Sequence, residues 1–385
     1  MSVVPEIIRD AACLVVKVGS SLLVGEGSSV QSEWLRALAV DIAEANARGT
    51  KVVIVTSGAV AIGRTLMGTG SRWLDLTGKQ AAAACGQISL MVHWSDALTR
   101  CRPRALVPAQ VLLTVQDSEN RDRHLNVRNT FTKLLSHPHI IPIVNENDTV
   151  ATEEIRVGDN DRLAAQVAQM VSADLLILLS GIDGLYDADP AHSPDAEFIP
   201  EVDRITRQIE SMADMVTPDI GTGGMKTKVE AAKIAVAAGC HTIVADGRES
   251  NPLRRIIEGE RCTLFRARGN PVIARKKWIW STLNTNGSVV VDEEAVSALR
   301  AGKSLLPGGV SEVSGAFERG DAVDIKDAKY AVIGKGLTGY SAKDVTRIAG
   351  VQGTEIEGIL GTAFRDTLIH RDDLVLFDSH LKDAD

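Results

Sequence analysis

Short apolar runs alternate with helical segments from about residue 13 to residue 245, and this alternation constrains the fold more than any other feature of the chain. The runs are CLVVKV, KVVIV, IIPIV, LLILL and HTIVA, and helical patterns such as the one over 33–47 separate them. Strands that are apolar throughout are typical of parallel sheets with helices on both faces. We therefore predict an α/β domain with an open, mainly parallel sheet sandwiched by helices.

The pattern changes after about Leu264, where a stretch rich in arginine and proline leads into the short runs SVVVD, AVDI and YAVIGKGL, separated by glycine turns. Such runs predict a small barrel-like β module with one or two short helices. A chain of 385 residues has room for two domains. We expect the α/β domain over 1–270, a linker over 271–280, the β module over 281–373 and a C-terminal tail over 374–385.

Composition excludes several classes of protein. A net charge of −8 argues against a protein that grips a polyanion, which needs concentrated Lys and Arg. The five cysteines are widely spaced and form no C-x-x-C pair, so they predict neither a disulfide framework nor a zinc site. Charged residues interrupt the amino terminus, and no eighteen apolar residues run together. We expect a cytoplasmic protein without a membrane anchor.

Two polar clusters lie within the stretch NENDTVATEEIRVGDND, from Asn145 to Asp161. Asn145 and Asp148 follow the predicted strand IIPIV, and Asn160 and Asp161 lie near the start of the helical RLAAQVAQMV. Ligands of open α/β sheets bind at the carboxyl ends of the strands. An Asx turn and a helix cap are the alternative explanation for either cluster alone. Two clusters so close together favour a site for a charged metabolite.

Two strand ends carry further candidates. Lys17 lies at the end of the run CLVVKV, one residue before its last. Its ammonium group either faces a ligand or reaches water harmlessly, and both explanations stay open at this point. The run KVVIV is followed by Thr56, Ser57 and Gly58 and then by a helix. Backbone N–H groups at a helix start, with the Ser57 hydroxyl, would bind a carboxylate or a phosphate.

A glycine-rich segment, GTGGMKTK, precedes the helical pattern VEAAKIAVAAG. It departs from a Walker A loop because Met225 stands where that loop has glycine, and no apolar strand directly precedes it. A flexible linker is the alternative, but two lysines and two threonines at a helix start favour anion binding. The residues of interest are Thr222, Gly223, Gly224, Met225, Lys226, Thr227 and Lys228.

These residues together suit the transfer of a phosphoryl group to a carboxylate. Two unit charges about 4 Å apart repel by about 4 kcal/mol at an effective dielectric constant of 20, so the two anionic reactants need cations between them. Lysines from two separate loops and Mg²⁺ would meet that need, and positioning would supply much of the remaining acceleration.

The motifs KVGSS, VTSGAVAIG, NENDTV, VGDND, DGLYDADP and GTGGMKTK occur in one order, and as a set they resemble the glutamate 5-kinases of the amino acid kinase family. The C-terminal segments VVVDEEAVSALRAGKSLLPGGV, GAFERGD and RIAGVQGTEI resemble the PUA domain found in many bacterial members. The resemblance implies ATP- and Mg²⁺-dependent phosphorylation of the γ-carboxylate of L-glutamate to γ-glutamyl phosphate, the first step of proline biosynthesis.

Carried over position by position, the resemblance implies that Lys17 and Lys228 contact the phosphoryl group in flight and that Asp161 orients them. It implies a glutamate site and a nucleotide site. The expected glutamate-binding residues are Ser57, Gly58, Asn145, Asp148 and Asn160, and the expected ATP-binding residues are Lys17, Ser180, Gly181 and 222–228. We assign no residue as a metal ligand. Family members commonly carry Thr-Asp in place of Ser180-Gly181, so a carboxylate expected near the nucleotide is missing, and Asp183 is the nearest substitute.

Two alternatives remain. The first alternative is an enzyme with the same fold that phosphorylates another acceptor: aspartate, acetylglutamate, carbamate or a nucleotide. The paired NEND and GDND clusters favour glutamate over these acceptors. A PUA-type RNA-binding or regulatory protein with a degenerate kinase domain is the other; retention of Lys17, Asp161 and Lys228 argues against it, and the acidic PUA-like module argues against RNA. The resemblance also implies a homo-oligomer, dimer or tetramer, with feedback inhibition by proline and delivery of the product to glutamyl phosphate reductase.

Overall fold

The computed structural model describes residues 3–25, 29–70, 74–114, 117, 120–150, 159–215, 224–269, 271, 285–361 and 367–377. The chain divides into two compact units, one made of Met1–Glu119 with Val127–Pro271 and the other of Asn120–Asn126 with Val272–Asp385. The division expected from the sequence stays a prediction. Each unit has its own sheet and its own apolar core.

The larger unit contains an eight-stranded sheet in the order β3-β4-β2-β1-β5-β9-β10-β8. Every adjacent pair is parallel except β9 and β10, which confirms the mainly parallel sheet predicted from the apolar runs. The strands are β1 (Cys13–Val18), β2 (Lys51–Val55), β3 (Val107–Leu113), β4 (Ile140–Glu146), β5 (Leu175–Ser180), β8 (Glu201–Val202), β9 (His241–Asp246) and β10 (Cys262–Phe265).

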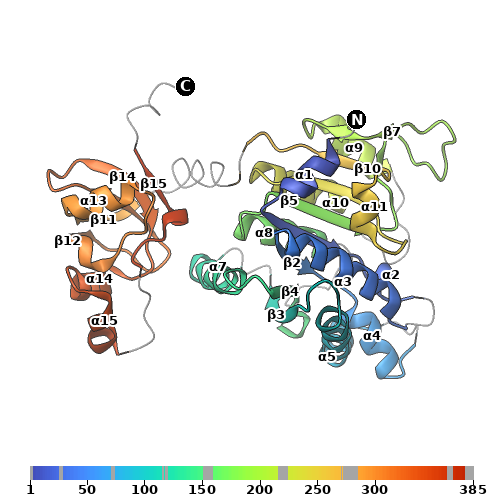
Figure 1. The fold of residues 1–385 in the computed structure, drawn as a ribbon, viewed down its shortest axis with the longest axis horizontal. Helices are drawn as coiled ribbons and strands as arrows, with labels where there is room; N and C mark the ends of the chain where they lie inside the picture. The colour runs from blue at the N-terminus through green and yellow to red at the C-terminus, as the bar shows by residue number, and fades with distance from the viewer. Residues whose placement is uncertain are drawn as a thin grey trace. The chain divides into compact units, whose positions relative to one another are not determined.

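Helices cover both faces of this sheet, as Figure 1 shows. The core on one face takes residues from α1 (Val4–Asp10), α2 (Ser20–Leu23), α3 (Ser32–Ala47), α4 (Ala59–Leu66), α5 (Leu76–Thr99) and α11 (Pro252–Ile257). The core on the other face takes residues from α7 (Arg121–Leu135), α8 (Asp159–Met170), α9 (Arg207–Met215) and α10 (Met225–Ala237).

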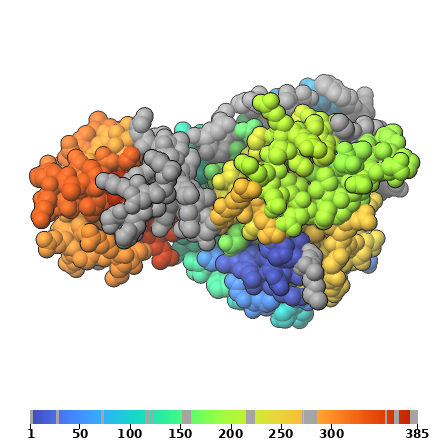
Figure 2. Space-filling view, turned by 90° about the horizontal axis from the view of Figure 1, so that it is seen from above, coloured from blue at the N-terminus to red at the C-terminus, as the bar shows by residue number. Residues whose placement is uncertain are grey.

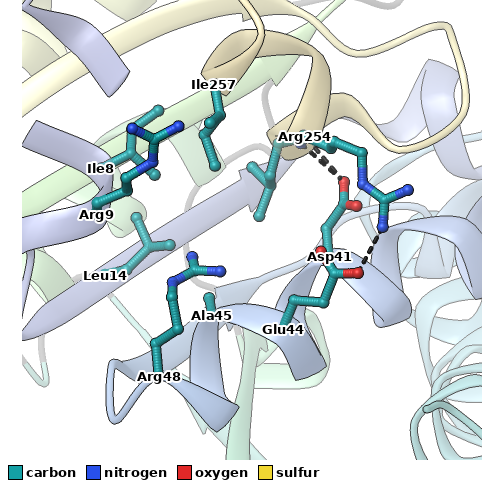
Figure 3. A pocket seen from close by; sticks show the side chains of 10 residues that line it. Ile8, Arg9, Leu14, Asp41, Glu44, Ala45, Arg48, Arg254 and Ile257 are labelled. Atoms are coloured by element: carbon teal, nitrogen blue, oxygen red, sulfur yellow. Dashed lines mark hydrogen bonds and ion pairs between the residues drawn. The ribbon is translucent and has the colours of Figure 1, made fainter. Parts of the chain in front are cut away.

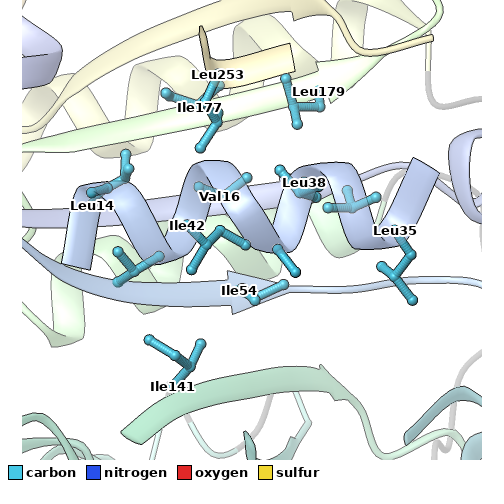
Figure 4. Packing of buried hydrophobic residues seen from close by; sticks show 14 of the residues in the cluster. Leu14, Val16, Leu35, Leu38, Ile42, Ile54, Ile141, Ile177, Leu179 and Leu253 are labelled. Carbon is cyan, nitrogen blue, oxygen red and sulfur yellow. The ribbon is translucent and has the colours of Figure 1, made fainter. Parts of the chain in front are cut away.

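The side-chain alternation of a strand assigns its residues to these two faces. Leu14, Val16 and Val18 of β1 enter the first core, and Cys13 and Val15 enter the second. Because successive side chains of a strand point to opposite faces, Lys17 projects from the second face, the one that α8 and α10 cover. The apolar stripe of α3 packs on the first face against β1 and β2 (Figure 4).

Helices α4 and α5 pack with their backbones almost in contact, and two glycines make this possible. A Cβ atom built on Gly86 would lie 1.9 Å from the carbonyl oxygen of Ala59, and one built on Gly63 would lie 1.7 Å from that of Ala82. No larger residue fits at such distances. Since α4 begins directly after Gly58, this packing fixes the end of the loop that follows β2.

The smaller unit contains a five-stranded sheet in the order β12-β11-β13-β14-β15. Its strands are β11 (Thr285–Val291), β12 (Val310–Gly315), β13 (Ala322–Lys326), β14 (Val332–Leu337) and β15 (Leu374–Leu376), with helices α13 (Glu293–Arg300), α14 (Ala342–Ile348) and α15 (Gly353–Leu360) and the 3₁₀ turns η3 (Pro307–Gly309) and η4 (Arg371–Asp373). The apolar runs predicted β11, β13 and β14. The sheet continues beyond Asp373, because β15 pairs antiparallel with β14.

A two-stranded ribbon of β6 (Leu185–Tyr186) and β7 (Phe198–Ile199) follows β5, and its connecting turn projects from the surface of the larger unit (Figure 2, yellow-green).

Within the described part of the chain, none of the helices combines the length and the apolar character needed to cross a bilayer. All five cysteines have free thiols, and only Cys85 is exposed.

We expect Gly86→Ala to destabilise the protein by about 1–3 kcal/mol, because the new methyl group must push α4 and α5 apart. Gly358→Ala is the matched control. Gly358 also lies in a helix, but nothing stands within 4 Å of its added Cβ, so alanine there should be neutral or stabilising by up to about 1 kcal/mol. Urea unfolding of the three proteins measures both effects, and equal effects at the two glycines would contradict the role of close helix packing.

Candidate functional site

Polar side chains gather at the carboxyl edge of the large sheet, where α4, α8 and α10 also begin. Lys17 lies near the end of β1, Ser57 follows β2, Asn145 lies near the end of β4 and Ser180 ends β5. Parallel strands that are neighbours in the sheet end at the same edge, so residues distant in sequence come together there. The runs CLVVKV and KVVIV end where β1 and β2 end, but β4 continues two residues past IIPIV to Glu146, so Asn145 lies within the strand instead of after it.

The centre of this edge holds a buried cluster of three charged side chains. Lys17 Nζ lies 2.6 Å from Asp161 Oδ1, and Lys228 Nζ lies 3.4 Å from Asp161 Oδ2. The three side chains are 6%, 2% and 0% exposed for Lys17, Lys228 and Asp161. The Thr227 hydroxyl also donates to Asp161 Oδ2, at 2.8 Å. Two ammonium groups thus share one carboxylate, and the three side chains together carry one excess positive charge.

Neither lysine comes from a loop, which corrects the expectation of two lysine-bearing loops. Lys17 belongs to β1, and Lys228 lies in the first turn of α10, which begins at Met225 rather than after the lysines. The early helix start has a further consequence for Lys226. Residues two positions apart on a helix point about 200° apart, so Lys226 faces solvent and pairs with Asp214 at 3.0 Å.

The electrostatics of the cluster determine its protonation. Burial acts to raise the pKa of the Asp161 carboxyl, but the ammonium groups of Lys17 and Lys228, with the hydrogen bonds from Lys17 and Thr227, outweigh burial and hold this pKa below its ordinary value. Burial lowers the pKa of Lys228, the nearby Lys17 ammonium lowers it further, and Asp161 offsets part of both effects. Asp161 is therefore an ionised anchor for two cations and not a proton acceptor at neutral pH.

A second cluster, made of neutral amides and hydroxyls, lies beside the charged one. Asn160 Nδ2 donates to the Thr56 carbonyl at 3.0 Å, to Ser57 Oγ at 2.8 Å and to Asn145 Oδ1 at 3.3 Å. These contacts join the start of α8 to the ends of β2 and β4. Asn160 Oδ1 is buried and has no hydrogen-bond partner among the described residues. Asp148 is buried in the 3₁₀ turn η2 (Asp148–Val150), which follows β4 closely.

Two helix starts add backbone donors. The residue before α4 is Gly58, with φ of 98°, a left-handed conformation that glycine adopts at no steric cost. The residue before α10 is Gly224, which as a glycine has no side chain that could cap that helix. The first N–H groups of both helices are therefore available to an anion. Met225 contributes backbone only, because its side chain is buried in the core under α10. Thr222 and Gly223 lie outside the described residues.

The end of β5 carries the residues expected near a nucleotide. Ser180 is buried, and its hydroxyl accepts from the Ile182 N–H at 3.4 Å. Gly181 has open space where a Cβ would lie. Asp183, the expected substitute for a missing carboxylate, accepts from the Tyr186 hydroxyl at 3.0 Å and lies 3.6 Å from Arg261, so its charge is already engaged.

Sequence reasoning missed one residue of this site. Gln87 of α5 accepts a hydrogen bond from Asn145 Nδ2 at 2.7 Å. The only signal in the sequence is a polar residue within the largely apolar stretch AAAACGQISLMV, and such a residue gives no indication of its partner.

A cavity of about 230 Å³ lies elsewhere, between α1, α3 and α11. It includes Leu14 at the start of β1, so it lies at the opposite edge of the sheet from the polar clusters. In its lining, Asp41 accepts from the Leu253 and Arg254 N–H groups, and Arg254 pairs with Glu44 (Figure 3). These contacts attach α11 to α3.

Comparison with known proteins gives matches over nearly the whole chain. Residues 12–246 match the model of the amino acid kinase family, and residues 287–360 match that of the PUA domain. A glutamate 5-kinase from Paramagnetospirillum magneticum is 54% identical over 94% of this chain and 97% of its own. A glutamate 5-kinase from Rhodopseudomonas palustris is 52% identical over 96% and 97%. Glutamate 5-kinase 1 from Mesorhizobium japonicum is 52% identical over 94% and 95%.

We expect Asp161→Asn to lower the free energy of unfolding by about 3–5 kcal/mol, because it leaves two buried ammonium groups without their carboxylate. Asp96→Asn is the control: Asp96 forms surface ion pairs with Arg36 and Arg100, and such pairs contribute about 0–1 kcal/mol. Chemical denaturation of the unliganded proteins measures both. A loss below about 1 kcal/mol for Asp161→Asn would show that the buried cluster is not held by its carboxylate.

Proposed function

The chain belongs to the amino acid kinase family, and from this premise we propose that it transfers the γ-phosphoryl group of ATP to the γ-carboxylate of L-glutamate. The products are γ-glutamyl 5-phosphate and ADP, and the reaction is the first step of proline biosynthesis. The observation that carries the proposal is the pair of buried ammonium groups that share Asp161 at the carboxyl edge of the sheet. Identity of 50% or more to glutamate 5-kinases over nearly the whole chain supports the choice of acceptor.

The chemistry needs no general base. A glutamate side chain has a pKa near 4.3, so the acceptor oxygen is already an anion at neutral pH. This oxygen forms a bond to the γ-phosphorus while the bond from that phosphorus to the bridging oxygen breaks, and ADP leaves with the electron pair. A proton-accepting carboxylate would serve no purpose in this step, which agrees with an Asp161 that two lysines keep ionised.

The chemistry does need positive charge between two anions. The ammonium groups of Lys17 and Lys228 carry that charge in a buried environment, where water screens it little. Asp161 holds both groups at one place and leaves an excess positive charge for the phosphoryl group. The first N–H groups of α10, which lie within the segment 222–228, would donate to the phosphates of ATP. Ser180 and Gly181 would border the nucleotide.

Glutamate would bind at the amide cluster. Its ammonium group would donate to Asn160 Oδ1, which is buried without a partner among the described residues, and would pair with Asp148. The Ser57 hydroxyl, the Gly58 N–H and the first N–H groups of α4 would donate to a carboxylate. Asn145 would support Asn160 from the end of β4.

Mg²⁺ would accompany ATP. Asp161, the buried carboxylate nearest the expected phosphates, already contacts Lys17, Lys228 and Thr227, so it is not placed to ligate a metal ion. Mg²⁺ retains several waters and binds readily to nucleotide phosphates, and there it would neutralise charge on the β- and γ-phosphates.

Incubation of the protein with ATP, Mg²⁺, glutamate and hydroxylamine should yield γ-glutamyl hydroxamate, because hydroxylamine traps an acyl phosphate. We expect Lys17→Met and Lys228→Met each to lower kcat by about 10²–10³-fold, the loss typical of removing one electrostatic donor from an active site. Lys226→Met is the matched control on the same helix, and it should stay within about threefold because Lys226 pairs with Asp214 at the surface.

Other outcomes of the same assay distinguish the alternatives. Hydroxamate from aspartate or acetylglutamate but not from glutamate would establish the fold with a different acceptor. Turnover of no acceptor, together with RNA binding by the intact chain, would favour the regulatory protein. Full activity of Lys228→Met would refute the role of the paired ammonium groups.

The family resemblance adds three further elements to the proposal. Proline, the end product of the pathway, inhibits the enzyme by feedback. Acyl phosphates hydrolyse readily in water, so glutamyl phosphate reductase receives the product promptly. The reaction takes place in the cytoplasm, in keeping with five free thiols, four of them buried.

The enzyme is also a homo-oligomer in this proposal, and the surface formed by α5 and β3 is its interface. A groove of about 380 Å³ there is lined by Gln87, Ile88, Met91, Val92, Ser95, Pro108 and Gln110. None of these residues is charged, so a second copy of the same surface meets no repulsion. Ile88 is 73% exposed and Val92 is 61% exposed, and β3 is one of the two edge strands of the sheet.

Val92→Asp should shift the protein toward single chains, because the substitution brings like charges together across a twofold interface. Leu306→Asp is the control, since Leu306 is 52% exposed but belongs to the smaller unit. Light scattering coupled to size-exclusion chromatography measures the mass of each variant. An unchanged mass for Val92→Asp, with its circular dichroism intact, would exclude α5 and β3 as the interface.

A further inference from the structure

Gln87 connects helix α5 to the polar edge of the sheet. Its Oε1 accepts from Asn145 Nδ2 at 2.7 Å, and that contact joins residues far apart in the sequence. The alternation of β4 explains why they meet. Ile141 and Ile143 enter the core that also contains Leu90 and Trp94 of α5, and Asn145 continues the same row of side chains at the carboxyl end.

The contacts around Asn160 fix the direction of every amide in this row. The Thr56 carbonyl is only an acceptor, so the group facing it at 3.0 Å is the NH₂ of Asn160. The oxygen of Asn145 faces that same NH₂ at 3.3 Å, which leaves the NH₂ of Asn145 to face Gln87. The row therefore runs in one direction, from the oxygen of Gln87 through Asn145 to Asn160.

This direction leaves the side-chain oxygen of Asn160 without a hydrogen-bond donor in the row. Asn160 Oδ1 is buried without a partner among the described residues, although a buried acceptor without a hydrogen bond costs about 1–3 kcal/mol. A ligand ammonium group would satisfy it. If the Asn145 amide turned over, its NH₂ would oppose the NH₂ of Asn160, and the orientation of Asn160 would lose its support.

The backbone of Gln87 is itself held in place. Gly86, its neighbour, lets α5 approach the start of α4 so closely that a Cβ would lie 2.6 Å from the Gly63 nitrogen and 1.9 Å from the Ala59 carbonyl oxygen. The residues before α4 are Ser57 and Gly58, which contribute the other side of the amide cluster. The same helix packing thus positions Gln87 and the loop after β2.

We propose that Gln87 is a positioning residue for the acceptor amino acid: by accepting from Asn145, it fixes the row of amides that presents Asn160 Oδ1 to the ammonium group of the acceptor. The proposal rests on the proposed function and deepens it. Gln87 acts through Asn145 and Asn160, so its effect falls on the acceptor and not on ATP. Position 87 requires a side-chain oxygen that accepts a hydrogen bond. The substitution Gln87→Glu also supplies such an oxygen.

Three substitutions test the proposal in the full-length protein. Gln87→Met keeps the side-chain volume but removes the oxygen, and it should raise KM for glutamate about tenfold, the loss expected for one hydrogen bond, with KM for ATP unchanged. Gln87→Glu keeps an oxygen that accepts from Asn145, so its KM for glutamate should stay within about threefold of the wild type when both proteins have the same mass by light scattering. Gln110→Met is the control. Gln110 lines the same groove from β3, so this substitution should leave KM for glutamate unchanged.

A direct measurement makes the test independent of turnover. Isothermal titration of each variant with glutamate, in the presence of Mg²⁺ and a non-hydrolysable ATP analogue, should give the same ranking as KM. Gln87→Ala, a helix-favouring substitution, replaces Gln87→Met if the latter lowers the melting temperature by more than a few degrees.

The proposal fails if Gln87→Met binds glutamate like the wild type, if Gln87→Glu is impaired equally, or if KM for ATP rises to the same extent. Failure of the proposed function has a different signature, since the wild-type protein would then neither bind nor phosphorylate glutamate.

Discussion

One carboxylate shared by two lysines is the interaction on which the site depends. Asp161 Oδ1 lies 2.6 Å from the Nζ atom of Lys17, which belongs to a strand, and Asp161 Oδ2 lies 3.4 Å from the Nζ atom of Lys228, which belongs to a helix. Ammonium groups are rarely buried without such a partner, because burial strongly disfavours their charged form. A single carboxylate is enough to keep both groups buried but not enough to neutralise them. The remaining positive charge suits a site that receives phosphate and carboxylate groups together.

The sheet places these three residues, and much of this could be predicted from the sequence. The apolar runs identified the strands, and the polar residues after them identified the ligand edge. The pairing of Lys17 with Lys228 through Asp161 was implied only by the family resemblance, since no local pattern shows which strands become neighbours. Side-chain alternation then explains it: Lys17 occupies the face with Cys13 and Val15, which α8 and α10 cover.

Other features could not be predicted because the neighbouring sequence carries no clear signal for them. The sequence did not show that α10 begins at Met225, so only the family resemblance distinguished Lys228 from Lys226, which faces the opposite side of the helix. β12 lacks an apolar run, since most of its side chains are exposed or half-buried, and β15 has only three residues. Gln87 lies in a helix whose neighbours are mostly apolar, and its role depends on a partner in β4.

The two halves of the site bind by different interactions, charge around Asp161 and directed hydrogen bonds around Asn160. Around Asp161 the groups are charged, and a charge stabilises any nearby anion with little regard to direction; such groups accelerate transfer but discriminate poorly. Around Asn160 the groups are neutral amides whose hydrogen bonds have fixed directions. A row of oriented donors and acceptors distinguishes an ammonium group from a carboxylate, because a reversed ligand leaves buried polar atoms unpaired. In the proposed reaction, the amides would therefore select the acceptor, and the lysines would accelerate the transfer.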